Sequence, residues 1–377
     1  MIAGTWIFVS RPFQLMPIAE RNQFAVEIFM PSGTSVERTT QVADSLERIL
    51  SKDDRIVSIA SFHGCASPRF QATYAPQVGG SNFAQFIVNT KSNEATIEVL
   101  DEYTGRYEAA FPDAFVRFKQ LSYSNAAYPV EVRLTGRNMA EIEAVADTFL
   151  SVMRGVPGLR SVRSSLDNPL ASVIVAPERT AASRLGLNSL ILESELVLRY
   201  STGLPLATLW EGDYALPVVL KTASADTASI SGLEEEPVGL TGVTSVPLRQ
   251  IAGLRPEWHP GMLQHRNGIP EISLIAEVER NVNVIDRTEK LMERLDKIEI
   301  PDSVTVKRGG EWDTSMSILP QILSALAMAV AIIFFIILFH YSQIDTATLM
   351  LLCLTLSIPG AGIGMWLQGT VLSLTCV

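Results

Sequence analysis

The chain has 377 residues, and its 30 basic and 40 acidic residues give a formal net charge of −10. This acidic balance, without any cluster of Lys and Arg, argues against nucleic acid as a partner. Three cysteines are too few for a disulfide framework, and the length predicts roughly two or three domains.

The first residues are apolar but too few to span a bilayer. Residues 2–9 carry no charge, whereas a membrane helix needs about 20 apolar residues. A signal peptide would place basic residues before the apolar stretch, but here Arg11 follows it. The pattern predicts that residues 1–22 are the end of a truncated transmembrane helix and a linker. The alternative is the start of a soluble domain.

Residues 23–125 alternate between strand and helix patterns. Apolar residues from Phe24 to Met30 recur with the period of two that is typical of a strand, and Thr34 or Ser35 can cap the helix that follows. The predicted strands are 23–30, 56–62, 82–89 and 114–119, and the predicted helices are 34–51 and 93–110. Two β-α-β passes therefore form a first subdomain.

A second β-α-β pattern follows and is interrupted by a long insertion. Asn138 and Glu141 form a capping-box arrangement at the start of a predicted helix. The predicted strands are 129–135, 159–164, 171–175, 270–278 and 304–308, and the predicted helices are 138–153 and 284–298. Residues 126–177 and 257–311 form a second subdomain. Residues 178–256 are inserted into it, and their pattern differs, with one helical segment followed by short strands and turns. Split units of this kind favour an α+β fold with ferredoxin-like β-α-β subdomains.

The C-terminal part of the chain is strongly apolar. From Ile318 onward, Asp345 is the only Asp, Glu, Lys or Arg. The uncharged stretch 322–339 covers about 27 Å, close to the ~30 Å hydrocarbon core of a bilayer. A second stretch, 346–367, carries Pro359 and several glycines, which a membrane helix tolerates beside neighbouring helices. The predicted transmembrane helices are 312–341 and 346–370. The alternative is a pair of buried core helices.

No residue spacing indicates a catalytic or metal-binding site. The four histidines are scattered, and none lies one helical turn from another histidine or from a cysteine. The glycine pairs 79–80 and 309–310 lack the pattern of a phosphate loop. The methionines recur at core spacing. We therefore expect no enzyme activity, no cofactor and no metal site.

A cluster of aromatic residues is the candidate binding site. It is interleaved with glycines and prolines, and such side chains on a loop beside a sheet can line an apolar, adaptable pocket. The candidate substrate-binding residues are Phe62, Phe70, Tyr74, Phe83 and Phe86. Phe83 or Phe86 could equally belong to the core, because both fall on a predicted strand.

Several short motifs occur in a characteristic order along nearly the whole chain. They are MPIAER at 16–21, PSGT at 31–34, SVPL at 245–248, RNGIP at 266–270, GGE at 309–311 and PGA at 359–361. Each is weak alone, but their order and spacing resemble the C-terminal half of a resistance-nodulation-division (RND) efflux permease. The first two resemble the segment that leaves the seventh transmembrane helix of that family. The last two resemble its eighth and ninth helices.

The resemblance implies a function and partners. The two predicted subdomains would form a porter, and the inserted segment a docking subdomain. The family's proteins sit in the bacterial inner membrane as multi-pass antiporters with a large periplasmic domain, and the multidrug branch exports amphiphilic or apolar compounds. Expected partners are the lipid bilayer, a periplasmic adaptor protein, an outer-membrane channel and further copies of the chain in a homotrimer. The loop from Phe62 to Tyr74 falls where the family has a substrate-gating loop.

Other hypotheses are kept beside this one. The heavy-metal branch of the same family would require methionines converging in the cleft, and the sequence has none between Met30 and Met139. A non-transporting, membrane-anchored scaffold or fragment is another hypothesis, and a stand-alone periplasmic binding domain at 21–311 is a third. The proton-carrying side chains of the family's fourth and tenth helices lie outside this chain. The chain alone is therefore not expected to couple a proton gradient to transport.

Overall fold

The computed structural model describes residues 13–14, 18–75, 77–108, 110–167, 169–184, 189–200, 203–221, 230–238, 245–280, 282–355, 360, 363–364, 367 and 372–373. The chain divides into two compact units: the first is Met1–Pro169 with Pro260–Val377, and the second is Leu170–His259. Each unit has a hydrophobic core of its own.

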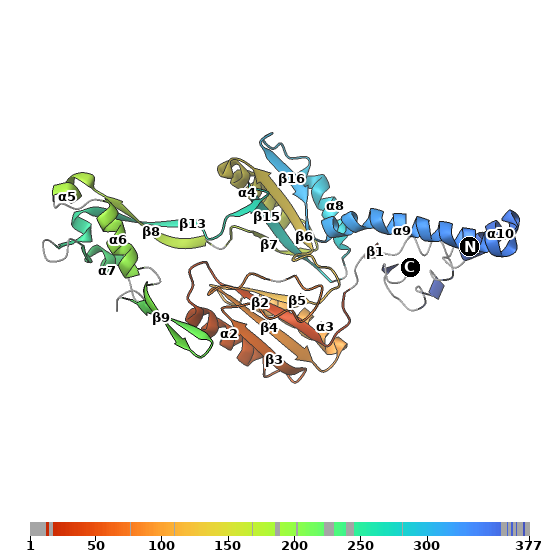
Figure 1. The fold of residues 1–377 in the computed structure, drawn as a ribbon, viewed down its shortest axis with the longest axis horizontal. Helices are drawn as coiled ribbons and strands as arrows, with labels where there is room; N and C mark the ends of the chain where they lie inside the picture. The colour runs from red at the N-terminus through yellow and green to blue at the C-terminus, as the bar shows by residue number, and fades with distance from the viewer. Residues whose placement is uncertain are drawn as a thin grey trace. The chain divides into compact units, whose positions relative to one another are not determined.

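The first subdomain is a four-stranded antiparallel sheet with helices on one face (Figure 1). In chain order its elements are β2 (Gln23–Phe29), α2 (Val36–Leu50), β3 (Ile56–His63), β4 (Phe83–Thr90), α3 (Asn93–Tyr107) and β5 (Phe115–Gln120). The strand order across the sheet is β3-β4-β2-β5. These elements confirm the predicted strands and helices of this region to within a few residues.

The alternation of side-chain direction along each strand explains which residues of this sheet the helices cover. Phe24, Val26 and Ile28 of β2 are completely buried against apolar side chains of α2 and α3. Both helices begin at a serine that was available for capping: Ser35 accepts a hydrogen bond from the backbone N–H of Arg38, and Ser92 from that of Ala95. Such caps satisfy backbone donors that a helix leaves free in its first turn.

The second subdomain repeats this plan around its own sheet. Its strands are β6 (Val130–Gly136), β7 (Leu159–Ser164), β14 (Gln264–Arg266), β15 (Ile269–Val278) and β16 (Val304–Arg308), and its helices are α4 (Met139–Arg154) and α8 (Val284–Leu295). The order is β14-β15-β6-β16, and β7 also pairs with β15. Side chains of β6, α4, β15 and α8 share one core, so the two sequence segments on either side of the second unit fold together.

The second unit contains the inserted segment and the strands that flank it. Its elements are β8 (Pro169–Pro177), α5 (Arg179–Arg184), α6 (Ser189–Tyr200), β9 (Leu204–Glu211), β10 (Tyr214–Leu220), α7 (Ile230–Glu234), β11 (Pro237–Val238), β12 (Val246–Pro247), a 3₁₀ turn (Leu248–Gln250) and β13 (Ala252–Pro260). β8 pairs with β13, and β9 forms an exposed antiparallel hairpin with β10.

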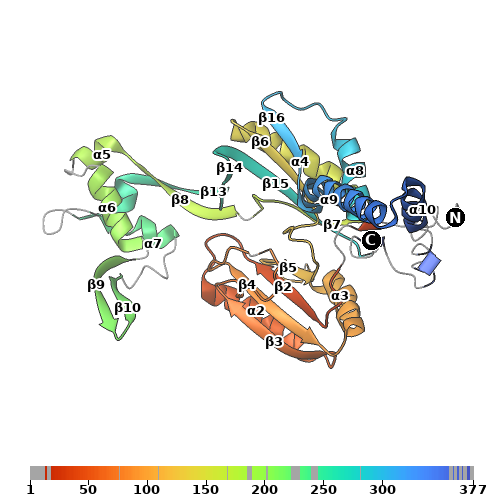
Figure 2. The same ribbon diagram turned by 45° about the vertical axis from the view of Figure 1, so that its right-hand side comes forward.

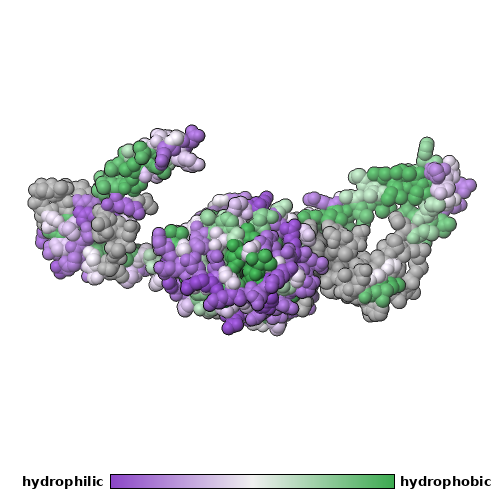
Figure 3. All heavy atoms as spheres, turned by 90° about the horizontal axis from the view of Figure 1, so that it is seen from below, coloured by the Kyte–Doolittle hydropathy of each residue, from purple (hydrophilic) through white to green (hydrophobic). Residues whose placement is uncertain are grey.

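The C-terminal region is dominated by one long helix. Among the described residues, α9 (Gly310–Tyr341) is the one helix long and apolar enough to cross a membrane. Its apolar surface is visible on the right of Figure 3, away from the largely hydrophilic subdomains. It begins before the predicted span and continues through Pro320 without interruption.

A short helix follows, and it overlaps the second predicted span. This helix, α10, is Ile344–Thr355, and most of the predicted span beyond residue 355 lies outside the described residues. The predicted helix end at residues 1–10 also lies outside them. Two short strands, β1 (Phe13–Gln14) and β17 (Leu372–Ser373), pair in parallel.

Candidate functional site

A row of polar side chains crosses the face of the first sheet opposite its helices. The strand register places Gln85 of β4 beside Glu27 of β2, and Glu27 beside Arg117 of β5. All three side chains are almost completely buried. Burying a carboxylate and a guanidinium is favourable only when both are paired and hydrogen-bonded. The row is therefore an arranged network and not a random feature of the sheet.

Glu27 is held as an anion by its neighbours. Arg117 Nη1 lies 3.0 Å from Glu27 Oε2, and the Tyr74 hydroxyl donates a hydrogen bond to Oε1 of the same carboxylate. Gln85 Nε2 donates in turn to the Tyr74 hydroxyl, at 2.8 Å. Burial by itself raises the pKa of Glu27, but the charges of Arg117 and Lys119 and the hydrogen bond from Tyr74 outweigh it, so the pKa is lowered.

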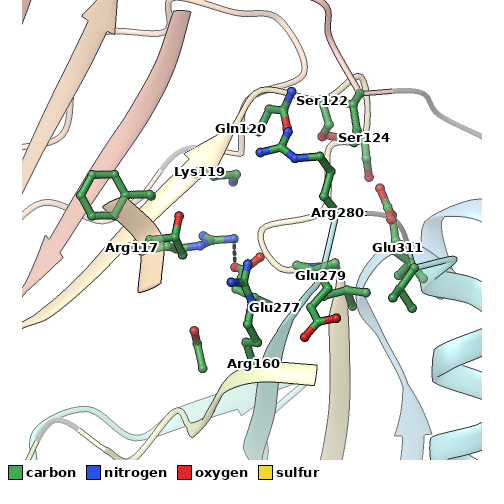
Figure 4. Close-up of a pocket in the computed structure, with 18 of the residues that line it drawn as sticks. Arg117, Lys119, Gln120, Ser122, Ser124, Arg160, Glu277, Glu279, Arg280 and Glu311 are labelled. Atoms are coloured by element: carbon green, nitrogen blue, oxygen red, sulfur yellow. Dashed lines mark hydrogen bonds and ion pairs between the residues drawn. The ribbon is translucent and has the colours of Figure 1, made fainter. Parts of the chain in front are cut away.

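Arg117 also reaches across to the second subdomain. Its Nη2 atom lies 2.5 Å from Oε1 of Glu277, at the end of β15, as Figure 4 shows. The guanidinium also stacks over the Tyr128 ring, 4.2 Å from its centroid. Burial lowers the pKa of Arg117, but the carboxylates of Glu277 and Glu27 raise it by more. One buried cation thus bridges two carboxylates from different subdomains.

A second connection lies close to the first. Arg280, which follows β15, donates to Asp101 of α3 at 2.8 Å and to the side chain of Gln120 at the end of β5. Figure 4 shows the Arg280 side chain extended toward Gln120. The two arginines therefore join the first subdomain to the second from opposite directions.

A cavity of about 190 Å³ lies between these two connections. It is lined by β5, α3, the ends of β7 and β15, and the first turns of α8 and α9. Its ionisable lining residues are the acids Asp101, Glu108, Glu277, Glu279 and Glu311 and the bases Arg117, Lys119, Arg160 and Arg280. Apolar side chains from the same elements complete the lining, and the ionisable groups offer a small, charged ligand direct partners.

Burial alters the acid–base properties of this lining. Burial and the nearby charge of Arg117 lower the pKa of Lys119 to about 8. The pKa of Glu108 is raised, mainly by burial. Within the described residues Glu108 and Glu279 make no ion pair. Acidic groups are therefore available in the cavity to a cation.

The five aromatic residues predicted to bind substrate lie elsewhere. Phe86 is fully buried in the core beneath α2 and α3, and Phe83 packs on the opposite face against Phe29, with ring centroids 5.2 Å apart. Phe70 and Tyr74 pack together at 4.7 Å over the polar row, and Phe62 is half-buried on β3. None of the five lines the cavity. Their role in substrate binding stays a prediction.

The charged residues of the network were missed because each lies in a strand of otherwise typical composition. Glu27, Gln85 and Arg117 each occupy the middle of an apolar strand. A charged or amide side chain at that position breaks the expectation for a strand buried on both faces. Three such positions on three strands of one sheet are a usable signal, because register can bring them side by side.

Comparison with known proteins places the whole chain in a family. The family model described as the AcrB/AcrD/AcrF family matches residues 1–377. The cobalt-zinc-cadmium resistance protein CzcA of Cupriavidus metallidurans is 20% identical over 382 residues, which cover 96% of this chain and 35% of that protein. The nickel-cobalt-cadmium resistance protein NccA of Alcaligenes xylosoxydans xylosoxydans is 26% identical over 274 residues, which cover 68% and 24%. The swarming motility protein SwrC of Bacillus subtilis is 20% identical over 369 residues, which cover 96% and 34%.

A solved structure shares the fold. The crystal structure of a heavy metal efflux pump matches with a TM-score of 0.78 and 17% identity, and the match covers 100% of this chain and 39% of that one. This chain spans about a third of the length of CzcA and SwrC and a quarter of NccA. The resemblance to RND permeases is confirmed at the level of the family. The chain belongs to the AcrB/AcrD/AcrF family.

Proposed function

We propose that this chain is the porter and docking part of an RND-type exporter whose substrates are divalent metal cations. The ionisable cavity carries the proposal, because its five acidic side chains outnumber its four basic ones and two of the acids, Glu108 and Glu279, make no ion pair within the described residues. CzcA and NccA are named for resistance to cobalt, zinc, cadmium and nickel, which supports the same substrate class. Hard oxygen ligands without a methionine cluster suit these ions better than Cu⁺ or Ag⁺.

The remaining parts of the proposal follow from the family. Residues 23–125 are a ferredoxin-like porter subdomain, and residues 126–169 with 260–309 are its partner. The segment Leu170–His259 is the docking part, which contacts neighbouring copies, an outer-membrane channel and an adaptor protein. Helix α9 and a second transmembrane helix beginning at α10 anchor the chain in the inner membrane, with the porter in the periplasm. The proton relay belongs to the rest of the permease.

The test is a resistance assay in the source cell. The gene that encodes the chain is disrupted and then restored, either as wild type or with Glu108→Gln or Glu279→Gln in the cavity. Disruption is expected to lower the tolerated concentrations of Zn²⁺, Co²⁺ or Cd²⁺ severalfold, and the cavity variants to restore tolerance poorly. Glu289→Gln is the control, because Glu289 is exposed on α8 and does not line the cavity.

The same assay separates the competing functions. Cells tested with dyes and detergents reveal export of amphiphilic compounds, which was the leading prediction from the sequence. Loss of dye tolerance with unchanged metal tolerance would overturn the metal proposal. Unchanged tolerance to both classes would favour a scaffold that does not transport.

A further inference from the structure

Three potential ligands converge on the first subdomain, outside the cavity. Asp44 and Glu47 lie one helical turn apart on α2, and His63 is the last residue of β3. The ligand atoms of the three side chains all lie within 4.8 Å of one another. None of the three lines the cavity between the subdomains. Sequence spacing did not reveal this group, because the histidine and the carboxylates come from different elements.

The fold of the first subdomain brings these three residues to one place. His63 pairs with Ala84 in the sheet, and Gly64 donates a hydrogen bond to the carbonyl of Phe83 at 2.9 Å. The His63 ring lies on the helix-covered face, 6.4 Å from the ring of Phe86. Helix α2 packs on the same face through its buried residues. The group therefore lies along the edge where α2 covers the edge strand of the sheet.

Two observations indicate that a ligand is missing from this arrangement. The Nε2 atom of His63 is buried, yet it has no hydrogen-bond partner. Neither Asp44 nor Glu47 makes an ion pair within the part of the chain that the structure describes. Buried ring nitrogens are normally hydrogen-bonded, and like charges one helical turn apart repel each other. A cation bound between the three groups would satisfy the nitrogen and neutralise the carboxylates.

We propose that Asp44, Glu47 and His63 bind a divalent transition-metal cation. An imidazole with two carboxylates selects Zn²⁺ or Co²⁺ over Mg²⁺ and Ca²⁺, which prefer oxygen ligands alone. Bonds of about 2.1 Å place neighbouring ligand atoms roughly 3.3 Å apart, so small side-chain rotations close the site. Asp44 is exposed and leaves room for water at the remaining coordination positions. Binding here is independent of the proposed export, since it needs neither the cavity nor a proton gradient.

The experiment is a titration of the purified, detergent-solubilised full chain with Co²⁺, followed by visible absorption. A nitrogen and oxygen ligand set of low coordination number gives d–d bands that aqueous Co²⁺ lacks. We expect saturable bands that Zn²⁺ displaces, and a loss of the corresponding affinity of at least tenfold in His63→Gln. Asp44→Asn is a second variant at an exposed position, so it reports on the site even if His63→Gln folds poorly.

Matched controls distinguish this site from other possible sites. His259→Gln removes an exposed histidine whose Nε2 lies 4.0 Å from a Glu257 carboxylate oxygen, and it should leave the bands unchanged. Glu289→Gln, at an exposed position on α8 that does not line the cavity, should also leave them unchanged. Bands that persist undiminished in both His63→Gln and Asp44→Asn, or a wild-type chain without such bands, would overturn the site.

Discussion

Arg117 illustrates how much a single buried cation can support. Its guanidinium contacts the carboxylates of Glu27 and Glu277, and only 3% of its side chain is exposed. Removing one partner of a buried ion pair leaves an uncompensated charge in a site of low polarity. The energetic consequence is therefore larger than the value of the ion pair itself, and it affects both subdomains.

Arg117→Met is expected to lower the free energy of unfolding by about 3–5 kcal/mol. Urea denaturation followed by circular dichroism measures the change. Arg38→Met serves as the control, because Arg38 pairs with Asp113 at a site where both side chains are about half exposed, and such pairs contribute less than about 1 kcal/mol. Equal effects of the two substitutions would contradict this account. The double variant Glu27→Gln/Arg117→Met should recover part of the loss.

Lys119 is expected to make the free energy of unfolding rise with pH in the alkaline range. Its folded-state pKa of about 8 lies below the ordinary value of 10.5, because burial and Arg117 disfavour its charge. Between these two pH values the unfolded chain binds more protons than the folded chain, so the contribution of Lys119 to stability rises with pH. Lys119→Met should abolish that rise. Thermal unfolding of both proteins between pH 7.5 and 10 measures the difference, and parallel profiles would show that Lys119 does not titrate in this way.

At the scale of elements, the junction between β16 and α9 is held closely against the backbone of another strand. Gly309 N–H donates to the carbonyl of Glu131 at 2.8 Å, and Glu311 N–H to that of Pro129 at 3.0 Å. Between them, Gly310 has a φ of +66°, and a Cβ added there would lie 2.6 Å from the Pro129 carbonyl oxygen. The two glycines, which the sequence analysis used only as part of a family motif, allow the chain to turn from strand into helix against another backbone.

Gly310→Ala is expected to destabilise the chain, with the positive φ alone costing roughly 1–3 kcal/mol and the close carbonyl adding to it. Gly105→Ala is the matched control. Gly105 is exposed within α3, and an added Cβ there would have no atom within 4 Å. It should stabilise α3 by about 0.5–1 kcal/mol. Thermal unfolding would contradict the argument if both alanines shifted the midpoint in the same direction.

Most elements were predictable because their patterns are local. The period of two in β2 and the capping of α2 by Ser35 depend on neighbouring residues alone, and the structure confirms them. Helix α3 begins at Asn93 as predicted, but its cap, Ser92, was not foreseen. The strand β14 was missed although Asn267 and Gly268, both at positive φ, link it to β15 in a tight hairpin. Asn-Gly is a strong signal for such a turn. The helix predicted to end at residue 110 ends at Tyr107 in the structure. Helix ends fray, so their positions are defined only to within one or two residues.

At the scale of the whole molecule, the two units differ in what stabilises them. The cores of the two subdomains contain no residue of Leu170–His259, although the second core joins segments on either side of it. The second unit has a separate, smaller core. Its hairpin of β9 and β10 carries exposed apolar side chains such as Leu209, Trp210 and Tyr214, and its apolar surface is visible in Figure 3. The two units should therefore unfold separately.

Replacing residues 170–259 by a turn of about four residues should leave the first unit folded. A short turn can join residues 169 and 260 because β8 and β13, which begin and end there, pair with each other. Ser172 of β8 donates a hydrogen bond to the Glu257 carbonyl of β13 at 3.1 Å. Circular dichroism and thermal unfolding of the detergent-solubilised protein check the result. Retention of the main cooperative transition is expected. Loss of that transition would mean that the inserted unit is needed for the first unit to fold. Figure 2 shows the strands β8 and β13 side by side.

The candidate site could be foreseen only in part. The family motifs indicated the family, because each is a short local string; the porter with two subdomains that they imply stays a prediction. The cavity could not be foreseen, since its lining is brought together by the register of β5 and by the meeting of β15, α3 and α9. The aromatic residues were chosen for their composition, whereas Phe86 and Tyr74 are buried by their positions in the sheet and loop. Long-range pairing decides which polar side chains meet, and a single sequence does not contain it.

The junction at Gly310 also determines how a small rotation at the sheet is passed along α9. Backbone hydrogen bonds from Gly309 and Glu311 hold the start of the helix against β6 and the residue before it, and Arg133 of β6 donates to Asp313 at 2.9 Å. Its 32 residues extend about 48 Å from that junction. A tilt of about 5° at the sheet would therefore move the far end by roughly 4 Å, a distance comparable with one helical turn. Conversely, a movement of about 4 Å imposed on the far end would tilt the helix by about 5°, and the backbone at the second sheet would move by a much smaller distance.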